Sequence, residues 1–466
     1  MSRIEKDLLG EESLPDHAYW GVHTARAMAN FAITGRPIAS YPSLVRALAA
    51  VKLAAARSNC ILGLLDEGKT SAIAGACEEI LQGRLREQFI VDVIQGGAGT
   101  STNMNANEVI ANRALELMDS AKGQYALLHP IDDVNLGQST NDVYPSALKL
   151  GLREVALGML QPALARLAHT FLHKAAQFDT VWKVGRTQLQ DAVPMTLGQE
   201  FRAFGYTLQA EVARLETALQ DLTSINLGGT AIGTGINCDA RYPALACGYL
   251  SELYRTEIRP AANLIEATQD TSCFVTLSSA LKRIAVKLSK ICNDLRLLSS
   301  GPVAGWQEIN LPPRAAGSSI MPGKVNPIIP EVVNQVCFQI IGNDVSVTLA
   351  AEAGQLQLNA FEPLMGHLLF DGINLLAAAC TTLTDHCVAG ITANPDHLLN
   401  LLMRSACLAT ALNPHIGYEK AAEVAKEAMR AGISVADAAL KMGLMEADQL
   451  ERLLRPESMS GHSQPA

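Results

Sequence analysis

The chain has 466 residues, of which 48% are hydrophobic, 18% charged and 5% aromatic, which excludes a largely disordered protein. Its formal net charge of -9, without a long basic run, excludes the electrostatic footprint of a nucleic-acid binder. We find no stretch of about 18 apolar residues that could span a bilayer and no apolar core of a signal peptide. We therefore expect a cytoplasmic protein with neither nucleic-acid nor membrane partners.

The elements predicted along the chain fall into three parts. Residues 1–139 mix short helical runs with turns and are expected to form an N-terminal domain. A central helical-bundle domain is predicted over residues 140–390, and a small helical C-terminal domain over residues 391–466, where Ser434 is a candidate N-cap. Long helices are predicted in the central part at residues 151–177, 197–222, 271–300, 331–361 and 364–391.

The segment 271–300 carries the clearest periodic signal. Its apolar residues alternate in spacing between three and four without interruption by Pro or Gly, which predicts one helix about 45 Å long with a coiled-coil seam. The seam consists of Phe274, Leu277, Leu281, Ile284, Leu288, Ile291, Leu295 and Leu298.

Helices of this length are expected to pack at shallow angles in a bundle. The fold class is therefore predicted to be mainly α. The periodicity agrees with an oligomeric bundle and with a monomeric five-helix bundle alike.

The ten cysteines and ten histidines show no metal-ligand spacing. The chain contains no C-x-x-C pair and no H-E-x-x-H motif. His169 and His173 are four residues apart but lie in a periodic helical stretch. We expect free, reduced thiols and no metal site.

Polar residues concentrate in three segments that do not follow the helical period. Residues 96–105 read GGAGTSTNMN, residues 138–142 read QSTND, and residues 185–191 read GRTQLQD. The glycines permit close backbone approach to a ligand, and hydroxyl or amide groups at a helix start can bind an anion. Ordinary turns and helix N-caps are the alternative interpretation.

A further segment, residues 317–327, surrounds Ser318, Ser319, Lys324 and Asn326 with small residues and prolines. It is not a phosphate-binding P-loop, because five residues instead of four separate its glycines. Val325 also stands where such a loop has a Mg²⁺-binding Ser or Thr. A plain exposed loop remains the alternative on local grounds.

Together these segments resemble the fumarase/aspartase superfamily. Its signature G-S-S-x-M-P-x-K-x-N matches residues 317–326 at every fixed position, and the likeness extends from residues 7–10 and 19–24 to residues 413–418. The resemblance implies a mainly α, three-domain fold with a central bundle of long helices.

Within the superfamily the segments 138–142, 189–194 and 354–359 resemble the aspartases. Gln188 stands where fumarases have His, which an acid such as Glu331 could support in activating water, whereas Gln cannot accept a proton. Residues 129–135, in contrast, resemble an accessory segment of fumarases. Fumarate hydratase is therefore the alternative enzyme, and an inactive crystallin-like member is the alternative without activity.

The resemblance implies reversible deamination of L-aspartate to fumarate by anti-elimination through an aci-carboxylate intermediate. Such a dianion needs preorganised cations and hydrogen-bond donors. Ser318 matches the family's catalytic base. The residues assigned to substrate binding are Thr100, Ser139, Thr140, Asn141, Thr187, Gln188, Ser319, Lys324 and Asn326.

The resemblance also implies assembly and cofactor use. The polar segments are expected to lie far apart in one subunit and to meet when a homotetramer forms, which gives active sites shared between subunits. No cofactor and no metal ligands are expected. Activation by a divalent cation such as Mg²⁺ is left open.

Overall fold

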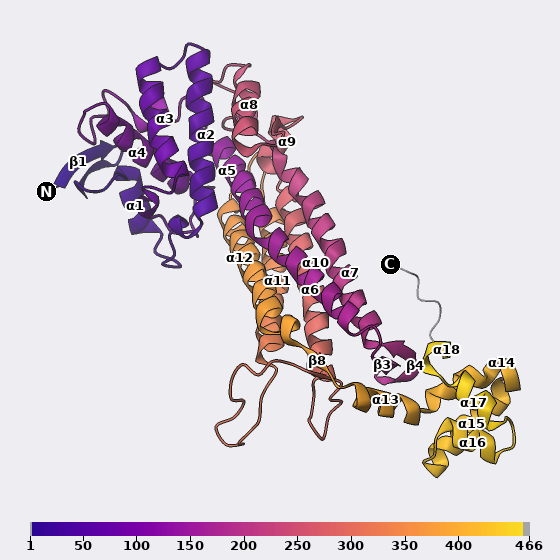
Figure 1. The fold of residues 1–466 in the computed structure, drawn as a ribbon. Helices are drawn as coiled ribbons and strands as arrows, with labels where there is room; N and C mark the ends of the chain where they lie inside the picture. The colour runs from indigo at the N-terminus through magenta and orange to yellow at the C-terminus, as the bar shows by residue number, and fades with distance from the viewer. Residues whose placement is uncertain (1, 460–466) are drawn as a thin grey trace. The chain divides into compact units, whose positions relative to one another are not determined.

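The computed structural model describes residues 2–459 of a mainly helical protein (Figure 1). Strands in this part of the chain form four two-stranded sheets. The chain divides into two compact units. The first contains Met1–Pro162, Ala213–Ala285 and Phe338–Ala377, and the second contains Ala163–Val212, Val286–Cys337 and Ala378–Ala466.

The first unit is a helical layer around α2. It begins with the antiparallel hairpin of β1 (Ser2–Asp7) and β2 (Gly10–Pro15) and also holds the short parallel pair β5 (Ser224–Ile225) and β6 (Arg259–Pro260). Its helices are α1 (Val22–Asn30), α2 (Pro42–Ile61), α3 (Glu67–Leu81), α4 (Thr100–Leu117), α5 (Thr140–Val155), α8 (Tyr242–Tyr254) and α9 (Leu264–Gln269). Short helical turns are η1 (Ile38–Ser40), η2 (Arg86–Gln88), η3 (Pro130–Val134), η4 (Ala156–Leu160) and η5 (Asp221–Thr223).

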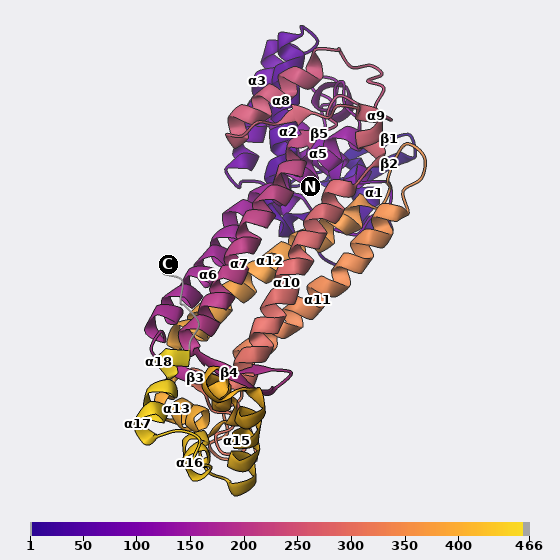
Figure 2. The same cartoon turned by 90° about the vertical axis from the view of Figure 1, so that its right-hand side faces the viewer.

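Helix α2 forms the centre of this unit because small and aliphatic residues cover all of its faces. Pro42 occupies its first turn, where a missing N–H costs nothing, and an alanine-rich run follows. Leu48, Val51 and Ala55 are fully buried. The helix packs against α3, α5 and α8, as both views show (Figures 1 and 2).

The second unit joins helices to a β-hairpin. It contains most of α6 (Gln161–Gln177), the antiparallel hairpin of β3 (Trp182–Thr187) and β4 (Gln190–Thr196), and the pair β7 (Ile309–Asn310) and β8 (Thr392–Ala393). Its C-terminal elements are η6 (Val388–Gly390), α13 (Pro395–Arg404), η7 (Ala406–Leu412), α14 (Asn413–Ile416), α15 (Tyr418–Ala431), α16 (Val435–Lys441), α17 (Ala447–Leu453) and α18 (Pro456–Met459).

Four long helices have residues in both units. They are α7 (Leu197–Gln220), α10 (Ser272–Leu298), α11 (Ile328–Glu352) and α12 (Glu362–His386). All eight positions of the predicted seam in α10 are at most 3% exposed, which confirms the interpretation of the 3/4 spacing. The long helices of the central part and the mainly α class are likewise confirmed.

Two predicted helix boundaries differ from the structure. Helix α11 ends at Glu352 instead of continuing to residue 361, because Gly354 disfavours helix and the Asn359 side chain donates to the carbonyl oxygens of Ala350 and Ala351 at 2.9 and 3.2 Å. The segment predicted as 151–177 begins earlier, at Thr140.

That segment is also interrupted by the π-helical turn η4. Pro162 lies two residues after the end of this turn. Proline has no N–H with which to bond the carbonyl four residues back, so a widened turn before it is expected.

The C-terminal helices share one apolar core with the β3–β4 hairpin. Val184 of β3 is buried together with Leu402, Leu412, Val424 and Leu450. Ser434 accepts a hydrogen bond from the backbone N–H of Asp437, which confirms the predicted N-cap of α16. The division at residues 139 and 390 stays a prediction.

One segment of the described chain, Glu362–Gly390, is long and apolar enough to cross a membrane by length and composition, although the sequence reading found none. The structure buries 56% of its most apolar window, as expected for a core helix. All ten cysteines are free thiols, and seven of them are buried.

Candidate active site

The first polar segment forms the start of α4. Gly97 and Gly99 have φ angles of +87° and +91°, and a side chain at Gly99 would lie 2.4 Å from the ring of Tyr144. Glycine is therefore required for α4 to begin this close to α5. Thr100 is the first residue of α4, is exposed, and donates its hydroxyl hydrogen to the carbonyl oxygen of Gly97 at 2.8 Å.

The second polar segment forms the start of α5. Ser139 and Asp142 form a reciprocal capping box, so the predicted N-cap is correct for Ser139. The Ser139 hydroxyl oxygen accepts from the N–H of Asn141 at 3.2 Å, and that of Thr140 accepts from Asn103 Nδ2 at 3.1 Å. Because each oxygen accepts a hydrogen bond from the protein, each hydroxyl hydrogen can be donated to an anion.

The contact between Asn103 and Thr140 also corrects one expectation. The resemblance implied that the polar segments lie far apart within a subunit. Residues 96–105 and 138–142 instead meet inside the first unit of a single chain. The glycines at residues 97 and 99 are the local cause, because they let the start of α4 approach α5.

A glycine-rich loop that sequence reasoning misses completes this half of the site. Asp142 Oδ2 accepts from the N–H groups of Gly228 and Thr230 at 2.9 and 3.0 Å, and Asn141 Nδ2 donates to the carbonyl of Ala231 at 2.8 Å. Burial raises the pKa of Asp142 to about 6, against the lowering effect of these N–H bonds. Four glycines at positions 228, 229, 233 and 235 were the available signal.

A cavity of about 430 Å³ opens in the first unit between these elements. Asn135, Gln138 and Ser139 line one part of it, and Thr230 and Asn237 line another. Its walls present these amide and hydroxyl groups beside the apolar side chains of Ile131, Leu136 and Ile236, a mixed lining that suits a small ligand with a few polar groups.

Thr187 and Gln188 lie in the second unit, on the β3–β4 hairpin. Thr187 pairs with Gln190, so Gln188 and Leu189 form a two-residue turn, with φ angles of +53° and +63°. The alternative interpretation, in which residues 185–191 cap a following helix, does not hold, because the run forms this hairpin tip. Such a turn favours Asn-Gly, so two residues with side chains hold it under strain, as functional sites often do.

The loop of residues 317–327, also in the second unit, is closed on itself. Gly317 donates to the carbonyl oxygen of Lys324 at 2.7 Å, and Asn326 Nδ2 donates to the carbonyl oxygen of Gly317 at 2.9 Å. A side chain at Gly317 would lie 2.6 Å from the Lys324 carbonyl oxygen. Glycine is therefore needed where the two ends of the loop meet.

Ser318 is placed at the base of this loop, beside the exposed Ser319. Its hydroxyl oxygen accepts hydrogen bonds from the backbone N–H groups of Ile320 and Met321 at 3.1 and 3.0 Å. Donors that stabilise the charged form of a group lower its pKa, so this arrangement favours an alkoxide. A serine in such a setting can act as a base.

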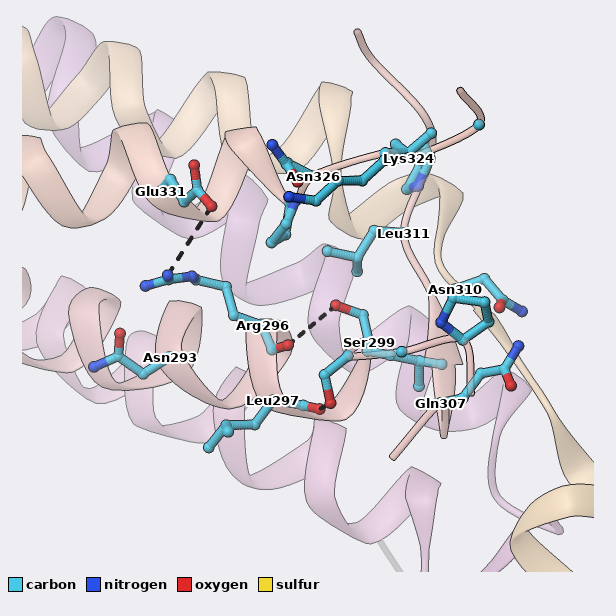
Figure 3. Close-up of a pocket in the computed structure, with 18 of the residues that line it drawn as sticks. Asn293, Arg296, Leu297, Ser299, Gln307, Asn310, Leu311, Lys324, Asn326 and Glu331 are labelled. Atoms are coloured by element: carbon cyan, nitrogen blue, oxygen red, sulfur yellow. Dashed lines mark hydrogen bonds and ion pairs between the residues drawn. The ribbon is translucent and has the colours of Figure 1, made fainter. Parts of the chain in front are cut away.

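A cavity of about 960 Å³ adjoins the same loop (Figure 3). Lys324 and Asn326 line it from the loop, and Arg296 and Glu331 line it from α10 and α11. Arg296 Nη2 lies 4.0 Å from Glu331 Oε1. The two cationic side chains and several amides of this lining suit an anionic ligand. Ser318 and Ser319 are not among the residues that line the cavity.

Comparisons with known proteins show to which family the chain belongs. The model of the lyase family matches residues 10–342, and that of the fumarase C C-terminus matches residues 408–461. Aspartate ammonia-lyases of Pseudomonas canavaninivorans and Escherichia coli (strain K12) are 57% and 50% identical over 458 residues, covering 98% of this chain and 96% of each relative. The chain belongs to the aspartate ammonia-lyase family.

Solved structures agree with this membership. A fumarate lyase:delta crystallin from Brucella melitensis bound to cobalt is 54% identical, covers 98% of this chain and 99% of its own, and has a TM-score of 0.96. A class II fumarase from Schistosoma mansoni is 35% identical with a TM-score of 0.94, covering 98% of this chain and 99% of its own. The predicted family and fold are confirmed.

In this member of the aspartate ammonia-lyase family, a buried charge network holds the hairpin that carries Thr187 and Gln188. Glu308 is fully buried and lies 2.6 Å from the ammonium of Lys183, which also contacts Glu200 at 2.7 Å. Arg186 forms a second ion pair with Glu308. The guanidinium of Arg186 stacks over Trp306, 4.3 Å from the ring centroid.

We predict that Glu308→Gln destabilises the second unit by about 3–5 kcal/mol, because it removes the buried carboxylate that Lys183 and Arg186 share and leaves Lys183 with Glu200 alone. Urea unfolding followed by the fluorescence of Trp182 and Trp306 measures the change. Glu451→Gln is the matched control, since Glu451 pairs with Arg455 on the surface and such pairs contribute about 0–1 kcal/mol. Equal stability of the two variants contradicts the anchoring role.

Proposed function

We propose that the protein converts L-aspartate reversibly to fumarate and ammonia. The observation that carries the proposal is the geometry of Ser318, whose hydroxyl oxygen accepts two backbone N–H groups in a closed loop. The other end of that loop brings Lys324 and Asn326 to a cavity whose two cationic side chains, Lys324 and Arg296, outnumber the one carboxylate of Glu331. Membership of the aspartate ammonia-lyase family supports the same reaction.

In the proposed reaction, Ser318 removes a proton from the substrate carbon beside a carboxylate. The charge that develops on that carboxylate, as the aci-carboxylate forms, requires donors and cations in place beforehand. Lys324 and Asn326 supply a cation and an amide, and Ser139 and Thr140 can supply hydroxyl donors. Thr100, Thr187 and Ser319 are assigned to the substrate on the resemblance, and Asn141 and Gln188 to the leaving amino group.

Fumarate hydratase is the second candidate, because the Schistosoma mansoni fumarase shares the fold at 35% identity. Hydration requires a group that accepts a proton from water. Gln188, at the hairpin tip, cannot do so, which favours aspartate over malate as substrate. An aspartate ammonia-lyase forms fumarate from L-aspartate, and a fumarate hydratase forms it from L-malate. The rate of fumarate formation from each substrate therefore separates the two candidates.

We predict that Ser318→Ala lowers the turnover of L-aspartate by roughly 10²–10⁴-fold, the usual loss on removal of a general base. The rate is measured by the ultraviolet absorbance of fumarate. Ser120→Ala is the control, because Ser120 lies in the turn after α4 and its hydroxyl bonds only the local backbone. Near-normal turnover in a folded Ser318→Ala variant would contradict the assignment of Ser318 as the base.

We propose that this chemistry needs no cofactor, since ammonium, hydroxyl and amide donors of the protein can stabilise the negative charge that develops on the substrate carboxylate. Extensive dialysis against a metal chelator is therefore expected to leave the deamination rate within about twofold of its starting value. Adding Mg²⁺ afterwards tests for activation. Loss of all activity on dialysis, restored by one divalent cation, contradicts the proposal.

We further propose a cytoplasmic homotetramer with active sites shared between subunits. One face of α11 supports association, because Phe338, Val345 and Leu349 are 60%, 58% and 62% exposed and follow one another at spacings of seven and four. A side chain at Gly342, between them, would meet no atom within 4 Å. A second copy of the same helix is the expected cover, as in a coiled coil.

We predict that Phe338→Glu yields smaller species with greatly reduced activity, because a charge on this face opposes its burial. Light scattering after size exclusion measures the mass. Met429→Glu is the control, since Met429 is 69% exposed on α15 in the second unit. Fully active monomers of Phe338→Glu contradict the shared-site proposal.

A further inference from the structure

Lys52 is a charged residue buried completely in the middle of α2. Its ammonium donates to Asn135 Oδ1 at 2.8 Å and to Gln138 Oε1 at 2.9 Å. Both partners are neutral amides, so the charge is solvated by dipoles instead of a contacting carboxylate. Burying an ammonium of this kind costs free energy of folding, and buried charges that are kept at such a cost are often functional.

The Asn135 side-chain oxygen that accepts a hydrogen bond from Lys52 also accepts hydrogen bonds from two other side-chain amides. Asn103 Nδ2 donates to it at 3.1 Å and Asn107 Nδ2 at 3.2 Å. The same Asn103 Nδ2 donates to Thr140 Oγ1 at 3.1 Å. A continuous chain of hydrogen bonds therefore leads from the ammonium of Lys52 to the hydroxyl of a predicted substrate-binding residue.

The direction of each bond in this chain follows from the charge at its start. An ammonium can only donate, so Asn135 must turn its oxygen toward Lys52, and Asn103 must then turn its NH₂ group toward Asn135. Within residues 2–459, Oδ1 of Asn103 and Oδ1 of Asn107 are buried and receive no hydrogen bond. The structure thus keeps these amide orientations at the cost of two unsatisfied oxygens.

We propose that Lys52 is a positioning residue that holds the hydroxyl of Thr140 as a donor toward a substrate carboxylate. It acts through Asn135 and Asn103, and it does not touch the substrate. With Asn103 donating to its oxygen, Thr140 has its own hydrogen left for the anion. The inference rests on the proposed function, because it takes a dicarboxylate as the ligand.

Two titratable groups influence Lys52. Asp142 on α5 favours its charged form, and Cys77 on α3 has its pKa raised by burial to about 12, so its thiol is neutral. Burial outweighs the attraction of Asp142 and lowers the pKa of Lys52 to about 7. A dicarboxylate bound beside Thr140 adds negative charge and favours protonated Lys52, so binding above this pH is accompanied by proton uptake.

The first test compares Lys52→Met, Thr140→Val and the double variant in the full-length protein. Succinate, an unreactive dicarboxylate, is the probe, and calorimetry gives its dissociation constant. Each single variant is expected to weaken binding roughly tenfold, as for one lost hydrogen bond to a charged ligand, and the double variant no further. Lys174→Met is the matched control, because Lys174 is also buried but lies on α6 in the second unit and donates to the carbonyl oxygen of Ile391, so this variant is expected to bind succinate as the wild type does.

A loss of about a hundredfold in the double variant means independent effects and overturns the inference. Wild-type affinity of Lys52→Met does the same. Asn103→Leu interrupts the chain while leaving both oxygens on Lys52, so it gives the answer if Lys52→Met does not fold. It is expected to match the loss seen in Thr140→Val.

The second test measures protons instead of affinity. Titration of wild type with succinate at about pH 8, in buffers of different ionisation enthalpy, is expected to show proton uptake that Lys52→Met lacks. A lysine that does not sense the bound dicarboxylate gives no such difference, so equal uptake overturns the inference. If wild type neither binds succinate nor deaminates L-aspartate, the proposed function fails instead.

Discussion

The apolar seam of α10 is the constraint on which the rest of the structure depends. Its eight aliphatic and aromatic positions are buried along a helix of 27 residues, so the neighbouring helices must present matching apolar faces along the same length. Hydrogen bonds within each unit then fix the register. In the first unit Ser278 and Lys282 contact Asp344 of α11, and in the second Asn334 of α11 contacts Ser289. The polar segments are loops and helix ends attached to these helices.

Buried charges hold the half-buried Ser139 and the exposed Thr187 of the candidate site. Asp142 binds the backbone of the glycine-rich loop beside Ser139, and Glu308 holds the hairpin behind Thr187. Such groups add little net stability for their desolvation, but they tolerate only one arrangement of their partners. They therefore confer geometric precision on site residues that are themselves less buried.

The surroundings of the site residues also determine which groups donate and which accept their hydrogen bonds. The hydroxyl oxygens of Ser139, Thr140 and Ser318 all accept from N–H groups of the protein. For Ser139 and Thr140 this leaves a hydrogen for an anion, and for Ser318 it favours loss of the proton. The same type of side chain thus acquires two chemical roles from its surroundings.

The sequence by itself determined the family, the helices and the loop of Ser318, because helical periodicity and the signature are properties of residues close together in the chain. The N-cap at Ser139 was among its alternatives, but the hairpin turn at Gln188 was not predicted, because the strained turn has no glycine to mark it. Only the tertiary structure could bring Lys52 to its partner Asn135, which lies 83 residues away in the chain. Asp142 and Thr230 are 88 residues apart. The burial that makes such contacts decisive is created by packing, which no local pattern encodes.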